Sequence, residues 1–473
     1  MARETKGNPM NPRKKVATRA AMSSKNKEQS GEQCQPKAPC SKFQQLPQAL
    51  VLEILSSVSI KTLLNCRCVC KDWLSIISDP QFTKLHSSRS PVGILIKTYP
   101  PIRKSRKLDF THIEDCAGSD LLLEKIRFNP QNSLPIGAMP EFRLINSCNG
   151  LLCLSGPNRD YPCFVCNPIL GEHISIPPTN LSRNKCFFVG LGFSNGTNEY
   201  KLLQMTNGTE AEIYTIGTGV WRSVGNAPGD IDQLPFNPFL HGALHWVSYS
   251  STVPDFIHSF HFEREQFRPL PVPSLLGNRF SDCYILEVVG GCLCLSVFDD
   301  DYSKFDMWVM KEYGVQESWT KVLVFGNLYE CPEERICHVY EPIMFLRNGE
   351  ILLLFNNCAV VCYNQETKSF REIRITWTRS PFEAIAYSPS FVSLYNVSKG
   401  EEVKRVRRGK KLGKKSGKLL LEGSYECAGF AGFNSEDKDC IHSMRWPLGL
   451  CCKRLRFPMC QQCFESFDDT GSS

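Results

Sequence analysis

Two histidine pairs have spacings that invite a metal or catalytic interpretation. His241 and His245 stand four positions apart in the segment HGALHW, which we predict to be a strand, so both side chains would lie on one face of a sheet. His258 and His261 are three positions apart in IHSFHF, and in a strand this spacing places them on opposite faces, which is poor for sharing one ion. We therefore interpret all four as structural and assign them no ligand role.

Other motifs in the body of the chain are equally poor in chemistry. Asp299, Asp300 and Asp301 form a run between two predicted strands, without the spaced pattern of a calcium-binding loop. The body contains no phosphate-binding loop, no G-x-S-x-G nucleophile motif and no paired zinc motif. For the body of the chain we predict no catalytic residues, no cofactor and no metal site.

A cluster of potential metal ligands lies near the end of the sequence. Cys460 and Cys463 form a C-x-x-C pair, whereas a structural zinc site needs four ligands, normally as two such pairs. The other candidate ligands in this segment are Cys427, Cys440, His442, Cys451 and Cys452. Zinc binding by this cluster is left open.

The elements that would position these residues form a repeat. Glycines lead an apolar segment in each of five units, at Asn149-Gly150, Gly190, Gly242, Gly290-Gly291 and Asn348-Gly349. A strand, a turn and a second strand close each unit. The corresponding landmarks are Ile174, Trp221, Phe267, Trp319 and Phe370, which stand 47, 46, 52 and 51 residues apart. About fifty residues is the length of a kelch-type propeller blade.

Short apolar runs separated by glycine-containing turns predict small antiparallel sheets, which stabilise one another by stacking in a ring. Additional strands are predicted at 92–97, 107–113 and 387–395, and they would form a closing blade from both ends of the domain. We predict six blades, and the repeat alone also allows five or seven.

Before the repeat, residues 43–86 contain three helical signals within about forty residues. Pro47 suits a first helical turn, and Leu50, Ile54 and Val58 recur every four residues. Ser59 is a plausible N-cap for the second helix, and the third, carrying Val69 and Trp73, ends at Asp79-Pro80. So small a bundle usually needs a metal, a disulfide or a partner for stability, and we expect a partner.

This segment resembles the F-box in its Leu46-Pro47 opening, the LEIL run at 52–55, the CRCVCKDW run at 66–73 and the closing SDPQFTKLH. One departure is Val58-Ser59, where plant members commonly carry Leu-Pro. The repeats resemble the F-box-associated region of plant F-box proteins in NSCNGLLCL, CNPILGEHISIPP and LGFSNGTNEYKLLQM. The expected fold is therefore α+β and multidomain: a small three-helix F-box, an all-β kelch-like propeller and disordered basic tails.

The resemblance implies a substrate-recognition subunit of a Skp-cullin-F-box ubiquitin ligase. The F-box would bind the Skp-type adaptor, and through it the cullin-RING ligase, while the propeller would hold an unknown protein target. The implied adaptor-binding residues are apolar, and some of them must instead form the core of the helices. They are Leu46, Pro47, Leu50, Ile54, Leu55, Leu63, Leu64, Val69 and Trp73. Such a subunit acts by proximity and needs no nucleophile.

Two other functions stay open on the sequence. An adaptor-bound scaffold or decoy would bind the adaptor without delivering a target. A propeller oxidase would need Tyr, His and Cys ligands converging at the centre of the ring, and no motif supports this.

Charge is distributed unevenly along the chain. Residues 1–45 carry ten Lys/Arg and three Asp/Glu, and residues 399–418 carry ten and two, so the remainder of a chain with net charge +7 is acidic, at −8. The acidic body does not favour nucleic-acid binding. The basic segment 404–418 suggests either nuclear import or a solubilising tail.

Location and domain layout follow from these patterns. No apolar run is long enough to span a membrane, and the basic residues near the start precede no apolar stretch, so we expect no secretory signal. We expect the protein in the nucleus, the cytoplasm or both, with its 24 cysteines reduced. The predicted layout is a basic tail at 1–42, the F-box at 43–88, the propeller at 92–396 and a basic, cysteine-containing tail at 397–473.

Overall fold

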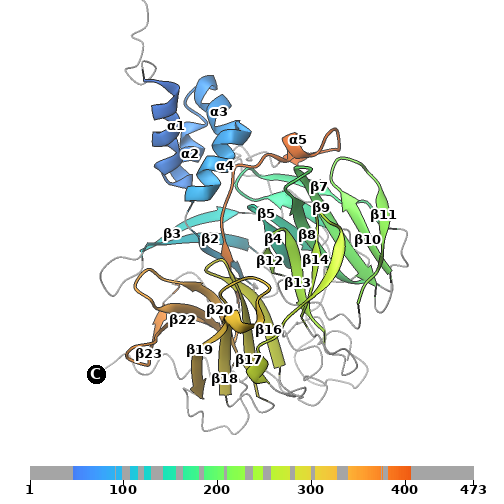
Figure 1. Ribbon diagram of the computed structural model, residues 1–473. Coiled ribbons are helices and arrows are strands. Elements are labelled where there is room, and N and C mark those ends of the chain that lie inside the picture. Colours follow the sequence, from blue (N-terminus) through green and yellow to red (C-terminus); the bar gives the residue numbers. More distant parts are fainter. Residues whose placement is uncertain are drawn as a thin grey trace, which may run out of the picture. The chain divides into compact units, whose positions relative to one another are not determined.

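The computed structural model describes residues 46–405 with internal gaps (Figure 1). The gaps are residues 91, 99–106, 115–121, 129–141, 156–162, 180–185, 207–209, 229–237, 249–256, 277–282, 300–303, 327–338, 374 and 376–381. The chain divides into two compact units, residues 1–51 and 52–473. Of the first unit, the described residues are 46–51, which include the start of the first helix.

Four α-helices occupy the described residues 46–90, one more than predicted. They are α1 (Gln48–Ser57), α2 (Ile60–Cys66), α3 (Lys71–Ser78) and α4 (Pro80–Arg89). The extra helix begins at the dipeptide that was expected only to end the third. The Asp79 carboxylate accepts hydrogen bonds from the backbone N–H of Gln81 (2.7 Å) and Phe82 (3.4 Å), and Pro80 occupies the first turn, where its missing N–H costs nothing. Asp79-Pro80 therefore ends α3 and starts α4.

Side-chain caps also fix the starts of α2 and α3. Ser59 accepts a hydrogen bond from the backbone N–H of Thr62 (3.4 Å), which confirms it as the N-cap of α2. The cap of α3 is Cys70, whose sulfur accepts from the N–H of Trp73 (3.4 Å). Because Cys70 is extended, Val69 lies before α3, and its predicted place in the third helix is wrong.

Strands of the described residues form six antiparallel sheets, which we call blades 1 to 6 in the order of their innermost strands. Blade 1 contains β4 (Arg143–Cys148), β5 (Leu151–Ser155), β6 (Phe164–Asn167), β7 (Glu172–Ser175) and β25 (Lys404–Arg405). Blade 2 contains β8 (Cys186–Ser194), β9 (Glu199–Thr206), β10 (Glu210–Thr215) and β11 (Trp221–Asn226). Blade 3 contains β12 (Phe239–Leu240), β13 (Ala243–Val247), β14 (Ile257–His261) and β15 (Gln266–Leu270).

The remaining blades follow the same plan. Blade 4 contains β16 (Cys283–Val289), β17 (Cys292–Phe298), β18 (Lys304–Met310) and β19 (Trp319–Gly326). Blade 5 contains β20 (Tyr340–Phe345), β21 (Ile351–Phe355), β22 (Ala359–Asn364) and β23 (Ser369–Ile373). Blade 6 contains β24 (Phe382–Tyr387), β1 (Gly93–Thr98), β2 (Lys107–Glu114) and β3 (Leu122–Phe128). Short helices lie at η4 (Ser274–Leu276), η5 (Gln316–Ser318) and α5 (Leu394–Val397).

The observed blades confirm the repeat read from the sequence. All five landmark residues, from Ile174 to Phe370, fall in the fourth strand of their blades, and the six sheets match the predicted number. Blade 6 is composite, as expected, because β24 pairs antiparallel with β1 from Gly93↔Tyr387 to Thr98↔Phe382. Its late strand lies at 382–387, whereas the sequence predicted 387–395, and β3 was not predicted.

One predicted strand begins earlier than expected. Gly190 was expected to lead it, but β8 begins at Cys186, so Gly190 lies inside the strand, whereas Gly150 and Gly242 precede theirs. A Cβ at Gly190 would overlap Leu244, and a Cβ at Gly192 would overlap the ring of Phe262. These glycines therefore let blades 2 and 3 approach closely.

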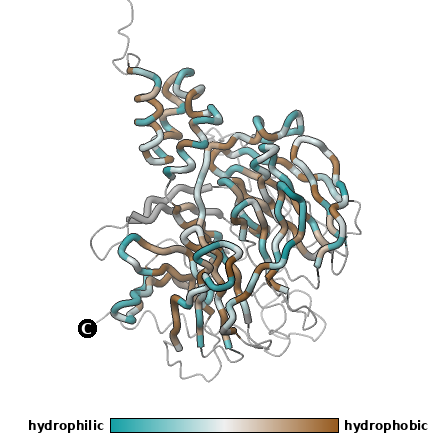
Figure 2. The backbone as a smooth tube through the Cα atoms, in the orientation of Figure 1, coloured by the Kyte–Doolittle hydropathy of each residue, from teal (hydrophilic) through white to brown (hydrophobic). Residues whose placement is uncertain are grey.

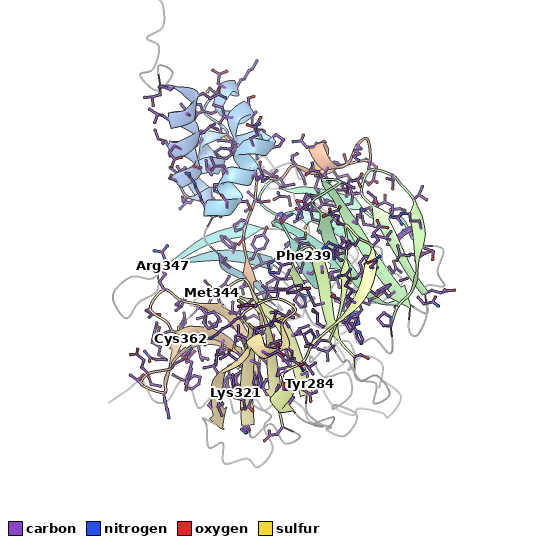
Figure 3. All side chains as sticks on the ribbon, viewed as in Figure 1. Phe239, Tyr284, Lys321, Met344, Arg347 and Cys362 are labelled. Carbon is purple, nitrogen blue, oxygen red and sulfur yellow. The ribbon has the colours of Figure 1, made fainter. Side chains whose placement is uncertain are left out.

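Apolar side chains between neighbouring blades form the core. Figure 2 shows hydrophobic stretches running along the strands. Blades 2, 3 and 4 share a cluster around Trp246, Phe260 and Leu286, all fully buried. Blades 5 and 6 share a second cluster of buried apolar side chains (Figure 3). Cys362 is buried in this cluster, and Met344 packs against the cluster. Stacking of blades therefore supplies the burial that a single small sheet lacks.

After β24, residues 388–405 form a segment that we call the strap. It crosses blade 1, where Asn167 donates to the carbonyls of Ser390 (3.0 Å) and Val392 (2.7 Å). The buried Glu172 accepts from the backbone N–H of Leu394 (2.8 Å), at the start of α5. The strap ends in β25, which pairs with β7.

The strap therefore extends the folded part beyond the predicted boundary at residue 396. The basic segment was expected to be disordered from Lys404 onward, but Lys404 and Arg405 form β25. Residues 406–473, which hold the rest of the basic segment and the C-terminal cysteines, lie outside the described residues, as do residues 1–45.

No helix in the described part of the chain is long and apolar enough to span a membrane.

Candidate functional site

Helix α1 begins as its proline predicts. The Pro47 carbonyl accepts hydrogen bonds from the N–H groups of Leu50 (2.9 Å) and Val51 (3.2 Å), so Pro47 immediately precedes the first turn. Leu50 and Ile54 are four positions apart in α1 and therefore lie on one face of this helix. They are 50% and 44% exposed.

The structure divides the predicted adaptor-binding residues into two sets. Leu55 and Leu63 are buried, at 2% and 0% exposure, and so belong to the interior. Exposed members of the set are Pro47, Leu50, Ile54 and Val69, and half-buried members are Leu46, Leu64 and Trp73. The exposed and half-buried residues are available to a partner, whereas Leu55 and Leu63 can act only by holding the helices in shape.

Sequence reasoning missed one exposed residue of this kind. Leu74 in α3 is 40% exposed, close to the exposure of Ile54. Leu74 follows Trp73 directly. The prediction relied on the i, i+4 spacing that relates Trp73 to Ile77, and this spacing does not include Leu74. Large apolar side chains left in water on so short a segment are typical of an interaction surface.

An exposed ion pair links the end of α4 to the second half of α1. The Arg89 guanidinium contacts the Glu53 carboxylate (2.7 Å) and donates to the Ser56 hydroxyl (2.8 Å). Both charged side chains are largely exposed, so the pair adds little stability. In α4, His86 is buried and its ring stacks at 6.0 Å on Phe82, and burial lowers the pKa of His86 to about 4.

The four histidines considered in the sequence analysis as possible metal ligands lie in blade 3. His241 lies in the turn between β12 and β13, so its predicted place in a strand beside His245 is wrong. His245 is buried; its Nδ1–H donates to the Pro238 carbonyl (3.2 Å) and its Nε2 accepts from the Tyr313 hydroxyl (2.7 Å). Burial lowers the pKa of His245 to about 4, so the ring is neutral and fully hydrogen-bonded.

His258 and His261 lie in β14, with His258 buried and His261 half-buried. Asp299 follows β17, whereas Asp300 and Asp301 lie outside the described residues. Across the described ranges, no group of three or more His, Cys, Asp or Glu side chains is placed to hold a metal ion.

Comparison with known proteins identifies both parts of the chain. Residues 43–85 match the F-box domain, and residues 113–394 match the F-box associated beta propeller domain. The second match covers more than half of the chain. The chain belongs to this F-box family.

Relatives of this F-box protein occur in Arabidopsis thaliana. F-box protein At3g07870 is 28% identical over 379 residues, which are 70% of this chain and 88% of that protein. F-box/kelch-repeat protein At3g23880 is 25% identical over 343 residues, covering 67% of this chain and 87% of that protein. F-box protein CPR1 is 25% identical over 414 residues, covering 77% of this chain and 94% of that protein.

Proposed function

We propose that this F-box protein is a substrate-recognition subunit of a Skp-cullin-F-box ubiquitin ligase. The exposed apolar side chains of its F-box bind the Skp-type adaptor, and its propeller binds a protein target for ubiquitylation. The observation that carries this proposal is the pair Leu50 and Ile54, which are half exposed on one face of α1 inside a matched F-box.

Energetics support a partner at this face. Transfer of the exposed part of Leu50 and Ile54 out of water is favourable at about 25 cal/mol per Å² of apolar surface. An aspartate in place of either would carry an unpaired charge into a desolvated interface. The chain's part in ubiquitylation is to hold the target near the charged enzyme, which raises the effective concentration of target lysines.

Protein half-lives in cells test this proposal. We compare cells that express the full chain with cells that express the Leu50→Asp variant. We expect at least one protein labelled by a proximity enzyme fused to the chain to become longer-lived with the variant. If adaptor binding is lost and no labelled protein changes its half-life, the chain is a scaffold or decoy and the ligase function is wrong.

We further propose that the protein acts in the nucleus, the cytoplasm or both, with the basic segment 404–418 as an import signal. Removal of residues 406–418, which leaves the strap and β25 intact, should lower the nuclear fraction of a fluorescent fusion. An unchanged nuclear fraction would assign the segment to solubility instead.

A further inference from the structure

The turn between β18 and β19 is longer than its counterparts. It contains eight residues, Lys311–Ser318, whereas four residues join β14 to β15 and four join β22 to β23. The turn lies at the same end of its sheet as these equivalent turns, because in each blade it joins the third strand to the fourth. Function on a rigid scaffold is commonly carried by such insertions.

Internal hydrogen bonds order this turn. The N–H of Val315 donates to the Glu312 carbonyl (3.1 Å), and the N–H of Ser318 donates to the Val315 carbonyl (3.2 Å). The Ser318 hydroxyl lies within hydrogen-bond distance of the Glu312 and Val315 carbonyls, at 2.8 and 2.7 Å. The backbone of the turn is thus fixed before any partner arrives.

Two side chains also anchor the turn to blade 3. The Tyr313 hydroxyl donates to the buried His245, and the Tyr313 ring meets the His241 and His245 rings edge-on at 4.9 and 5.6 Å. The Gln316 amide donates to the Val272 carbonyl (3.1 Å). Because these contacts already restrict the turn, a partner would lose little conformational entropy by binding it.

Despite this anchoring, the turn presents apolar groups to water. Tyr313 is 37% exposed and Val315 is 39% exposed. The charged side chains around them balance, since Lys311 and Arg268 are positive and Glu312 and Glu317 are negative, and all four are exposed. A balanced surface with an aromatic and a valine at its centre fits an apolar pocket on a protein and does not fit a polyanion such as nucleic acid.

We propose that the Lys311–Ser318 turn is the element of the propeller that contacts the target, with Val315 and the Tyr313 ring entering an apolar pocket on a folded protein. This inference rests on the proposed function, because it names the surface through which the receptor holds its target. It assigns recognition to blade 4 and makes His245 a positioning residue that holds Tyr313 in place.

The chain offers a matched control for the test. Val220 lies in the equivalent turn of blade 2, between β10 and β11, and is 64% exposed. Val315→Asp and Val220→Asp therefore make the same change at two exposed valines in equivalent turns of two blades. The full chain, fused to a proximity-labelling enzyme, is expressed as wild type, as each of these variants and as Ile54→Asp. Targets are the proteins that the wild type labels and that become longer-lived with Ile54→Asp.

We expect Val315→Asp to reduce target labelling about tenfold and to lengthen target half-lives, while labelling of the adaptor stays at the wild-type level. Val220→Asp should behave as the wild type. If Val315→Asp still labels and turns over the targets normally, or if Val220→Asp fails equally, the turn is not the contact and only this inference is overturned. If no protein becomes longer-lived with Ile54→Asp, the proposed function itself fails and this inference falls with it.

Discussion

Two glutamates in the inner strands of neighbouring blades make stability depend on pH. Glu287 lies on β16 and Glu341 on β20, and these strands pack against each other. Burial raises the pKa of Glu341 from 4.5 to about 7. Burial, together with the Glu341 charge, raises the pKa of Glu287 well above its usual range. One Glu287 oxygen is buried without a hydrogen-bond partner among the described residues, which agrees with a site that disfavours two charges.

The sign of the effect follows from proton linkage. The folded protein holds the Glu341 proton more tightly than the unfolded chain does, so stability is full below pH 4.5 and falls as the pH rises through 7. The difference between 7 and 4.5, at about 1.36 kcal/mol per pH unit, gives an upper limit of about 3 kcal/mol at pH 8, because both carboxylates are half-buried and water screens part of their charge. Glu341→Gln removes this titration, so the variant should be more stable than the wild type at pH 8 and equal to it near pH 4.

Urea unfolding followed by tryptophan fluorescence, at several pH values between 4 and 8, measures this difference. The control is Glu366→Gln, which removes the same charge from an exposed turn of blade 5 and should leave the pH dependence unchanged. Parallel curves for the wild type and Glu341→Gln would show that the half-buried pair does not carry the charge penalty, and the reasoning would be refuted.

Two further substitutions probe contacts between blades. Gly192→Ala should lower the free energy of unfolding by about 1–3 kcal/mol, because the new Cβ would overlap the Phe262 ring. In a double-mutant cycle, Phe262→Leu should recover part of this loss. Strictly additive losses from the two substitutions would contradict the clash. Trp319→Phe should cost about 1–3 kcal/mol in urea unfolding, because the Trp319 indole donates to the Pro271 carbonyl (2.8 Å) and the variant leaves that group unpaired. A loss no larger than that of the exposed Val220→Ala would show that the indole bond does not contribute.

The repeat was predictable because the residues that form equivalent strands recur at regular positions in the sequence. The outer strand of each of these blades packs one large side chain against the core, so Trp221, Phe267 and Trp319 recur at nearly constant spacing. Trp221 and Trp319 also donate to the carbonyls of Pro177 and Pro271, which follow the outer strands of the preceding blades. This bond between blades was not predictable, because it depends on which strands become neighbours.

Errors arose where one residue type serves two purposes. Gly190 was predicted to lead a strand, yet it lies inside β8, where the absence of a side chain allows close packing against Leu244. The apolar pattern at 387–395 was read as a strand, but there Phe391 and Leu394 are buried in the strap. Asp79-Pro80 was read as a stop, although an aspartate before proline is also a good helix start.

The candidate site shows the same limit. Several of the predicted contact residues are aliphatic and lie in predicted helices, so residue type and spacing do not separate interior residues from surface residues. This holds for Leu50, Ile54, Leu55 and Leu63. Their exposures of 50%, 44%, 2% and 0% separate them only once the helices are packed. The turn at Lys311–Ser318 carries no sequence motif, and only its anchoring and exposure single it out.

Binding of the purified full-length chain to a Skp-type adaptor tests the central claim most directly. Titration should give the same affinity for the wild type and for Val220→Asp, and an affinity at least about thirtyfold weaker for Ile54→Asp, which corresponds to about 2 kcal/mol for a charge placed in a desolvated contact. Equal binding by Ile54→Asp, with the chain folded in every case, would contradict the claim that this exposed face of α1 holds the adaptor.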